Sequence, residues 1–192
     1  MKCDCHASPW LRLPSLDPVA GPGVGPAACA RVSECPPEAK RPSVKLATVT
    51  WRPSPQIRAV AIAEIWRGGE ILVYEGYNPT TQETFYRPLG GGIDFGEPAV
   101  DALAREFREE IGAGLEGIRY LDTLESIYIF DGYPGHELVR VYEARLADPL
   151  LYEREAWSFE EDGSTCNVLW KRLEDFCIDR LYPDGLLELL ND

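Results

Sequence analysis

The chain has 192 residues, of which 45% are apolar and 27% are charged, and its formal net charge is −13. This length and apolar content suit one well-buried domain better than two. The negative charge excludes a nucleic-acid polymer or an anionic membrane as the main partner, because either would be repelled. A small anionic substrate fits if a metal ion holds it, since the ion reverses the local sign of the field.

Residues 1–43 differ in composition from the rest of the chain. They hold eight of the sixteen prolines and four of the six cysteines, with no periodic apolar run. We therefore predict a disordered tail over 1–43 and a globular domain over 44–192. No apolar run after Lys2 suits a signal peptide, and no stretch approaches the roughly 20 apolar residues that span a bilayer. We expect a cytoplasmic protein.

The tail contains five potential zinc ligands, which are Cys3, Cys5, His6, Cys29 and Cys35. Their spacing, set among prolines and glycines, does not match a zinc finger, so we do not expect zinc. Cys166 and Cys177 lie in the domain. We expect both to be small buried residues of a protein in a reducing compartment.

The domain begins with two runs typical of strands, residues 57–66 and 70–77. Arg67, Gly68 and Gly69 separate them, which predicts a hairpin with a short glycine turn. Further along the chain, the pattern predicts strands at 118–130, 137–146 and 168–173 and a closing helix at 184–190. Residues 131–135 are expected to form the turn between the first two of these strands.

Residues 98–112 have the periodicity of an amphipathic helix. Apolar residues recur at three- and four-residue steps, at Val100, Leu103, Phe107 and Ile111. They form one stripe that should face the core. Pro98 suits the first turn, and Gly112 or Gly114 suits the end.

Glu106, Glu109 and Glu110 gather on a second face of this helix. Their mutual repulsion is mildly unfavourable unless a cation lies between them, and oxygen ligands without His or Cys favour Mg²⁺ or Mn²⁺. A solvated helix face, with Arg105 and Arg108 as partners, is the simpler alternative. The glycine run at 90–92 favours the metal site, because a backbone without side chains can approach a ligand closely.

The segment 91–113 resembles the Nudix box, G-x5-E-x7-R-E-U-x-E-E-x-G-U, in which U is apolar. The matching residues are Gly91, Glu97, Arg105, Glu106, Phe107, Glu109, Glu110, Gly112 and Ala113. Every specified position agrees, and Ala113 is only smaller than usual. The resemblance implies an α/β fold, the Nudix α/β/α sandwich with a mixed β-sheet and the box as a loop-helix-loop unit.

The resemblance also implies Mg²⁺-dependent hydrolysis of a nucleoside diphosphate linked to another group, with Mn²⁺ as a possible substitute. Glu106 and Glu110 resemble the main metal ligands, and Glu109 a further ligand or the catalytic base. The Gly90 and Gly91 carbonyls can add backbone ligands. Arg105 resembles the arginine that pairs with the glutamate at position 97 and orients the loop. An acidic run could supply the base instead, although it is more simply an exposed loop. Its members are Glu153, Glu155, Glu160, Glu161 and Asp162.

Three residues near the expected site are candidates for substrate binding. Arg87 and Arg58 could hold phosphate oxygens, and Tyr128 lies where some relatives place a tyrosine. Other aromatic residues that could stack on a base, but are more often core, are Tyr86, Phe130, Tyr133 and Trp157. His136 is most simply a surface residue.

The sequence does not select the substrate, which we expect to be a small-molecule nucleotide. An ADP-ribose-like sugar nucleotide is the first candidate, and oxidised nucleoside triphosphates and dinucleoside polyphosphates are alternatives. A non-catalytic nucleotide-binding module with a Nudix fold is the alternative of another class, although such modules usually lack some box glutamates. A homodimer is left open.

Overall fold

The structure is a computed structural model, and it describes residues 52–161 and 164–191 of the chain. The predicted tail, its potential zinc ligands and Asp162 lie outside these residues. The predictions about them, and the boundary between residues 43 and 44, therefore stay predictions.

The described strands form two mixed sheets. The first has the order β5 (Gly90–Gly92), β1 (Ile57–Glu64), β7 (Tyr133–Leu146) and β6 (Leu115–Phe130), with β1 and β7 parallel. The second has the order β10 (Arg180–Leu181), β4 (Glu83–Pro88), β3 (Glu70–Asn78), β9 (Ser164–Arg172) and β8 (Ala156–Glu161). A short strand, β2 (Trp66–Arg67), pairs with β3.

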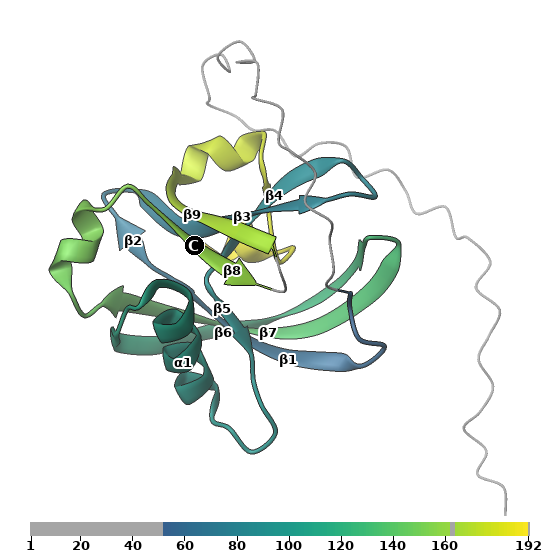
Figure 1. Ribbon diagram of the computed structural model, residues 1–192, viewed down its shortest axis with the longest axis horizontal. Coiled ribbons are helices and arrows are strands. Elements are labelled where there is room, and N and C mark those ends of the chain that lie inside the picture. The colour runs from purple at the N-terminus through teal and green to yellow at the C-terminus, as the bar shows by residue number, and fades with distance from the viewer. Residues whose placement is uncertain (1–51, 162–163, 192) are drawn as a thin grey trace, which may run out of the picture. The chain divides into compact units, whose positions relative to one another are not determined.

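Helical segments cover both sides of these strands. Helix α1 (Ala99–Ile111) lies on one side, and η2 (Leu173–Cys177) and α2 (Leu186–Leu189) lie on the other (Figure 1). A further short helix, η1 (Pro149–Glu153), follows β7. This arrangement confirms the predicted α/β class and the sandwich of helices around mixed sheets.

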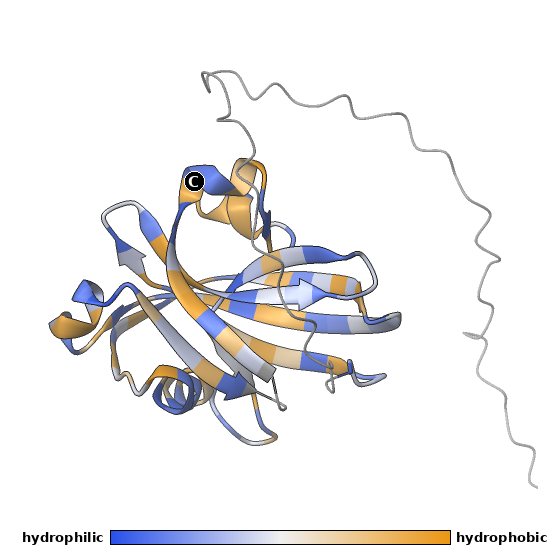
Figure 2. Cartoon of the chain, turned by 45° about the horizontal axis from the view of Figure 1, so that its top comes forward, coloured by the Kyte–Doolittle hydropathy of each residue, from blue (hydrophilic) through white to orange (hydrophobic). Residues whose placement is uncertain are grey.

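Strand β1 contributes to the core on both of its faces. Ala61 and Ala63 pack in the cluster that contains Phe107 of α1, whereas Val60 and Ile62 pack in the cluster on the other side. Side chains alternate across a strand, so a run that is apolar throughout can fill two cores at once. Figure 2 shows the resulting mixture of hydrophobic and hydrophilic bands along the strands.

The predicted hairpin with a short glycine turn is present, but it is shorter than expected and does not include β1. β1 and β3 belong to different sheets, and only the two-residue strand β2 pairs with β3 across Gly68 and Gly69. The chain leaves the first sheet after Glu64, and the Ile65 carbonyl accepts a hydrogen bond from the Leu72 amide (3.0 Å). Residues 57–66 and 70–77 are both apolar enough to pair with each other or with other strands. The local sequence pattern does not distinguish these two pairings.

Several other elements differ from the prediction. Strands β4, β5, β8 and β10 were not expected, and α2 is shorter than the predicted closing helix. The turn between β6 and β7 is only Asp131 and Gly132, whose φ angles of 50° and 79° match a two-residue hairpin turn. In the described residues, no helix has the length and apolarity needed to cross a bilayer.

Candidate active site

Helix α1 carries most of the box, and its bounds agree with the prediction. Gly112 ends the helix in the left-handed conformation (φ 69°), where its amide donates to the Arg108 carbonyl. Leu103, Phe107 and Ile111 are buried as expected. Val100 was predicted to be buried but is 42% exposed, and Ala102 is buried instead. Helix α1 contacts β8 of the second sheet as well as β1 and β5 of the first.

The glycine run before the helix is held to the first sheet. Gly90–Gly92 forms the edge strand β5, antiparallel to β1, rather than the irregular loop that was predicted. At Gly90, φ is +128°, and a Cβ atom would lie 2.2 Å from the Ala61 carbonyl oxygen. Only glycine permits this conformation and this contact. The remaining loop of the box, residues 93–98, begins where the Ile93 amide bonds to the Ala59 carbonyl (2.9 Å).

Arg105 joins this loop to the helix. Its Nε and Nη2 donate to the two carboxylate oxygens of Glu97, both at 3.0 Å, and Nη2 also donates to the Gly92 carbonyl (3.0 Å). The Glu97 carboxylate accepts a further bond from the Asp94 amide (3.1 Å). These hydrogen bonds, that from Arg105 above all, lower the pKa of Glu97 below its ordinary value.

Glu106 lies directly against the glycine strand. A Cβ atom on Gly91 would lie 2.4 Å from the Glu106 carboxylate carbon, so the absence of a side chain at 91 makes room for this carboxylate. Arg105 Nη1 donates to Glu106 Oε1 (2.8 Å) and approaches Glu109 Oε2 (3.5 Å). Arg105 therefore contacts three of the four box glutamates.

The three helical glutamates differ in exposure. Glu106 and Glu110 are half-buried, whereas the Glu109 side chain is 62% exposed. Among the described residues, no three His, Cys, Asp or Glu side chains come close enough together to hold a metal ion. The predicted convergence of the three carboxylates is thus not present in the structure, in which Arg105 pairs with two of them.

The acidic run was predicted to be a loop, but part of it forms a strand. Glu160 and Glu161 belong to β8, and Glu153 ends η1. Glu155 pairs with Arg67 (3.3 Å), and Glu160 accepts a bond from Thr165 (2.6 Å). Trp157, between them, is buried in the core beneath α1, which is why this segment is ordered against the helix.

The structure brings together all three predicted substrate-binding residues around a residue that was not predicted. Glu137 of β7 is only 2% exposed. Its carboxylate pairs with Arg58 Nη1 (3.3 Å) and Arg87 Nη2 (3.1 Å) and accepts a bond from the Tyr128 hydroxyl (3.1 Å). Glu137 shares a strand face with Val139 and Val141, and this period-two position was the sequence signal of burial.

The other aromatic residues and His136 have structural surroundings. Tyr86 and Trp157 are in the core, and Phe130 makes an edge contact with Phe85 (6.3 Å between centroids). His136 bonds to Glu125 (2.8 Å) in a half-exposed position. Cys177 is exposed, contrary to the prediction, and Cys166 is half-buried.

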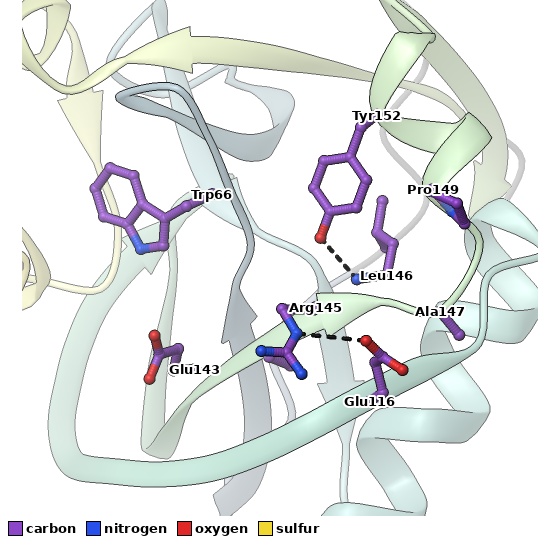
Figure 3. A pocket seen from close by; sticks show the side chains of 9 residues that line it. Trp66, Glu116, Glu143, Arg145, Leu146, Ala147, Pro149 and Tyr152 are labelled. Atoms are coloured by element: carbon purple, nitrogen blue, oxygen red, sulfur yellow. Dashed lines mark hydrogen bonds and ion pairs between the residues drawn. The ribbon is translucent and has the colours of Figure 1, made fainter.

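A hollow of about 530 Å³ is lined by residues outside the box (Figure 3). Its lining includes Trp66, Glu143 and Tyr152, with Arg145 bonded to Glu116 (3.4 Å). Residue 143 lies toward the end of β7, far along the strand from Glu137 near its beginning. None of residues 91–113 lines this hollow, so we do not assign the candidate active site to it.

Comparisons with known proteins agree with this fold. The model of the NUDIX domain matches residues 55–184, and the chain therefore belongs to the Nudix family. A MutT NUDIX hydrolase from Burkholderia pseudomallei is 27% identical, with a TM-score of 0.51 over 70% of this chain and 97% of its own. A NUDIX hydrolase from Nitrosomonas europaea shares the fold at 13% identity, with a TM-score of 0.52 over 71% of this chain and 87% of its own. The chain is thus a pyrophosphohydrolase of the Nudix class.

Proposed function

We propose that the protein hydrolyses a pyrophosphate bond in a nucleoside diphosphate linked to another moiety, with Mg²⁺ as its cofactor. The observation that supports this best is the contact between Glu106 and Gly91, with Arg105 bonded to Glu97 and to the Gly92 carbonyl. This contact places a box carboxylate against a bare backbone, where a polyphosphate can approach. It is the arrangement that the intact box implies.

The residues present fit Mg²⁺, or Mn²⁺ in its place. Carboxylate and carbonyl oxygens are the ligands that these ions prefer. We assign Glu106, Glu109 and Glu110 as ligands, with the Gly90 and Gly91 carbonyls. Among the described residues, Arg105 engages Glu106 through Oε1, which leaves Oε2 for a cation. The bound ion would neutralise phosphate oxygens and lower the pKa of the attacking water.

The protein side chains have separate roles in this proposal. Arg105 and Glu97 orient the loop against the helix, because a bidentate guanidinium pair fixes both distance and direction. Glu109 is exposed, whereas Glu106 and Glu110 are half-buried, and it takes the proton from water. Glu160 on β8 is the reserve base, because β8 packs near α1.

Arg87, Arg58 and Tyr128 are assigned to substrate binding. They come from three different strands and meet at Glu137, beside the glycine strand. An ADP-ribose-like sugar nucleotide is the first substrate to test, followed by oxidised nucleoside triphosphates and dinucleoside polyphosphates. We keep the cytoplasm as the expected compartment and a homodimer as a possible assembly.

The deciding experiment measures product release from a panel of these nucleotides with Mg²⁺ or Mn²⁺, for the wild type and Glu110→Gln. We expect the wild type to turn over one substrate class, and Glu110→Gln to lose at least about 99% of that turnover while keeping its melting temperature. Full activity of Glu110→Gln would overturn the metal assignment. Nucleotide binding without any turnover would favour the alternative of a non-catalytic binding module.

A further inference from the structure

Glu137 is a buried carboxylate that joins the two sheets. Arg58 lies on β1 of the first sheet and Arg87 on β4 of the second, and Glu137 pairs with both. Tyr128 on β6 donates to the same Oε1 that accepts from Arg58. A carboxylate buried to this extent requires such partners, because removing it from water without them would be costly.

The cluster has an excess of positive charge. Two guanidinium groups face one carboxylate, and Tyr128 stays neutral because burial, reinforced by Glu137, raises the pKa of its hydroxyl above the ordinary value. Among these four described side chains, positive charges therefore outnumber negative charges by one, in a chain of net charge −13. Among the described residues, the buried Nε of Arg87 has no hydrogen-bond partner. A buried donor without an acceptor, on a guanidinium group that lies close to a second one, favours an anionic ligand.

The excess charge lies beside the candidate active site. A Cβ atom on Gly92 would lie 3.4 Å from Arg58 Nη2, so this guanidinium borders the bare glycine backbone. The Gly92 carbonyl, in turn, accepts the bond from Arg105. The Arg58 side chain is 35% exposed and that of Arg87 is 17% exposed, so both are partly open to solvent while Glu137 is not.

We propose that Glu137 is a positioning residue, which holds Arg58 and Arg87 as a paired receptor for the diphosphate of the substrate, and that this receptor binds diphosphate without a metal. The inference rests on the proposed function and adds a specific role for Glu137. Arginine side chains lose conformational freedom when they bind a phosphate. Because Glu137 fixes both arginine side chains before the substrate binds, this loss of freedom is avoided and the spacing between the two guanidinium groups is set.

The test measures binding of inorganic pyrophosphate to the full chain in EDTA by calorimetry. Wild type is compared with Arg58→Gln, Glu137→Gln and the control Arg119→Gln. Arg119 is a suitable control because it also pairs with a glutamate, Glu143, across β6 and β7, but is 65% exposed. We expect Arg58→Gln and Glu137→Gln each to bind pyrophosphate about tenfold more weakly, and Arg119→Gln to bind like wild type.

A double variant distinguishes positioning from a separate contact. If Glu137 acts through the arginines, Arg58→Gln should weaken binding much less in the Glu137→Gln background than in the wild type. With the substrate of the panel, Glu137→Gln should raise KM about tenfold and leave kcat within about threefold. Should Glu137→Gln not fold, Tyr128→Phe takes its place, with an expected loss of about threefold in affinity.

The outcomes separate this inference from the proposed function. A wild type that turns over nucleotides but does not bind metal-free pyrophosphate overturns the receptor alone. Pyrophosphate affinity that is unchanged or tighter in Glu137→Gln, or unchanged in its Tyr128→Phe substitute, overturns the positioning role. Pyrophosphate binding without turnover of any nucleotide overturns the proposed function and leaves the receptor standing.

Discussion

Arg105 holds both carboxylate oxygens of Glu97 through two parallel hydrogen bonds of 3.0 Å. Glu97 lies in the loop of the box and Arg105 lies eight positions further along, in the helix, so this pair closes the loop onto the helix. The same guanidinium reaches the Gly92 carbonyl and the Glu106 carboxylate. One side chain therefore sets the relative positions of the strand, the loop and the helix.

Replacing Arg105 by lysine should loosen this connection while keeping the charge. An ammonium cannot reproduce two parallel hydrogen bonds, so we expect kcat/KM to fall about tenfold or more. The pKa of Glu97 should rise toward its ordinary value, as followed by carboxyl NMR signals in an acid titration. Arg108→Lys, at an exposed position of the same helix, is the control. An unchanged Glu97 titration in Arg105→Lys would contradict this account.

Gly91→Ala tests the space that Glu106 occupies. The new methyl group would lie 2.4 Å from the Glu106 carboxylate carbon, and the flexible end of that side chain would have to move. We expect turnover to fall about a hundredfold, with little change in melting temperature. Gly114→Ala is the matched control, because its Cβ would lie at an ordinary 3.5 Å from the Ala147 Cβ. Retained turnover in Gly91→Ala would show that the Glu106 position is not needed.

Glu64 provides a pH test of stability outside the site. It is 7% exposed, and burial, with a contribution from Glu143, raises its pKa above the ordinary value. The folded state therefore binds more protons than the unfolded state between the two pKa values, so stability falls as the pH rises through that window. Glu64→Gln should be more stable than wild type near pH 8, and this difference should vanish near about pH 4. A constant difference at all pH values would argue against burial of the charged form.

Deletion of residues 1–43 should leave turnover within about twofold of the full chain. The box and every residue assigned to the site lie between positions 58 and 160, and the composition of the first 43 residues predicts a dispensable tail. Steady-state rates of the two forms at equal concentration decide this point. A loss of activity on deletion would assign the segment a functional part.

The elements that could be predicted are those whose signal is local. The helix of the box is bounded by Pro98 and Gly112, and these residues act within one turn of the chain, so the predicted bounds agree with α1. The strands β6 and β7 were likewise expected, since both are long runs rich in β-branched, aromatic and other apolar residues. Strand β5 was missed, because three glycines carry no side-chain pattern and pair only when β1 lies beside them.

The burial of single residues shows the same difference between local signals and contacts that are distant in sequence. Val100 lies on the apolar stripe of the helix but is exposed, because the extent of the sheets beneath α1 decides which part of the stripe is covered. The prediction joined residues 57–66 and 70–77 into one hairpin. In the structure, the chain passes from the first sheet to the second at Ile65. A strand's partner depends on contacts that are distant in sequence, and the local pattern does not contain them.

The sequence by itself determined the family, the box helix and the candidate site residues, because these depend on residue type at fixed spacing along one segment. Only the tertiary structure decided that Arg58, Arg87 and Tyr128 meet at the buried Glu137. These residues come from separate strands of two sheets, and their contact depends on how those sheets pack. Burial of the Glu137 carboxylate depends on the positive charges that reach it from two other strands, and that condition is a property of the folded molecule.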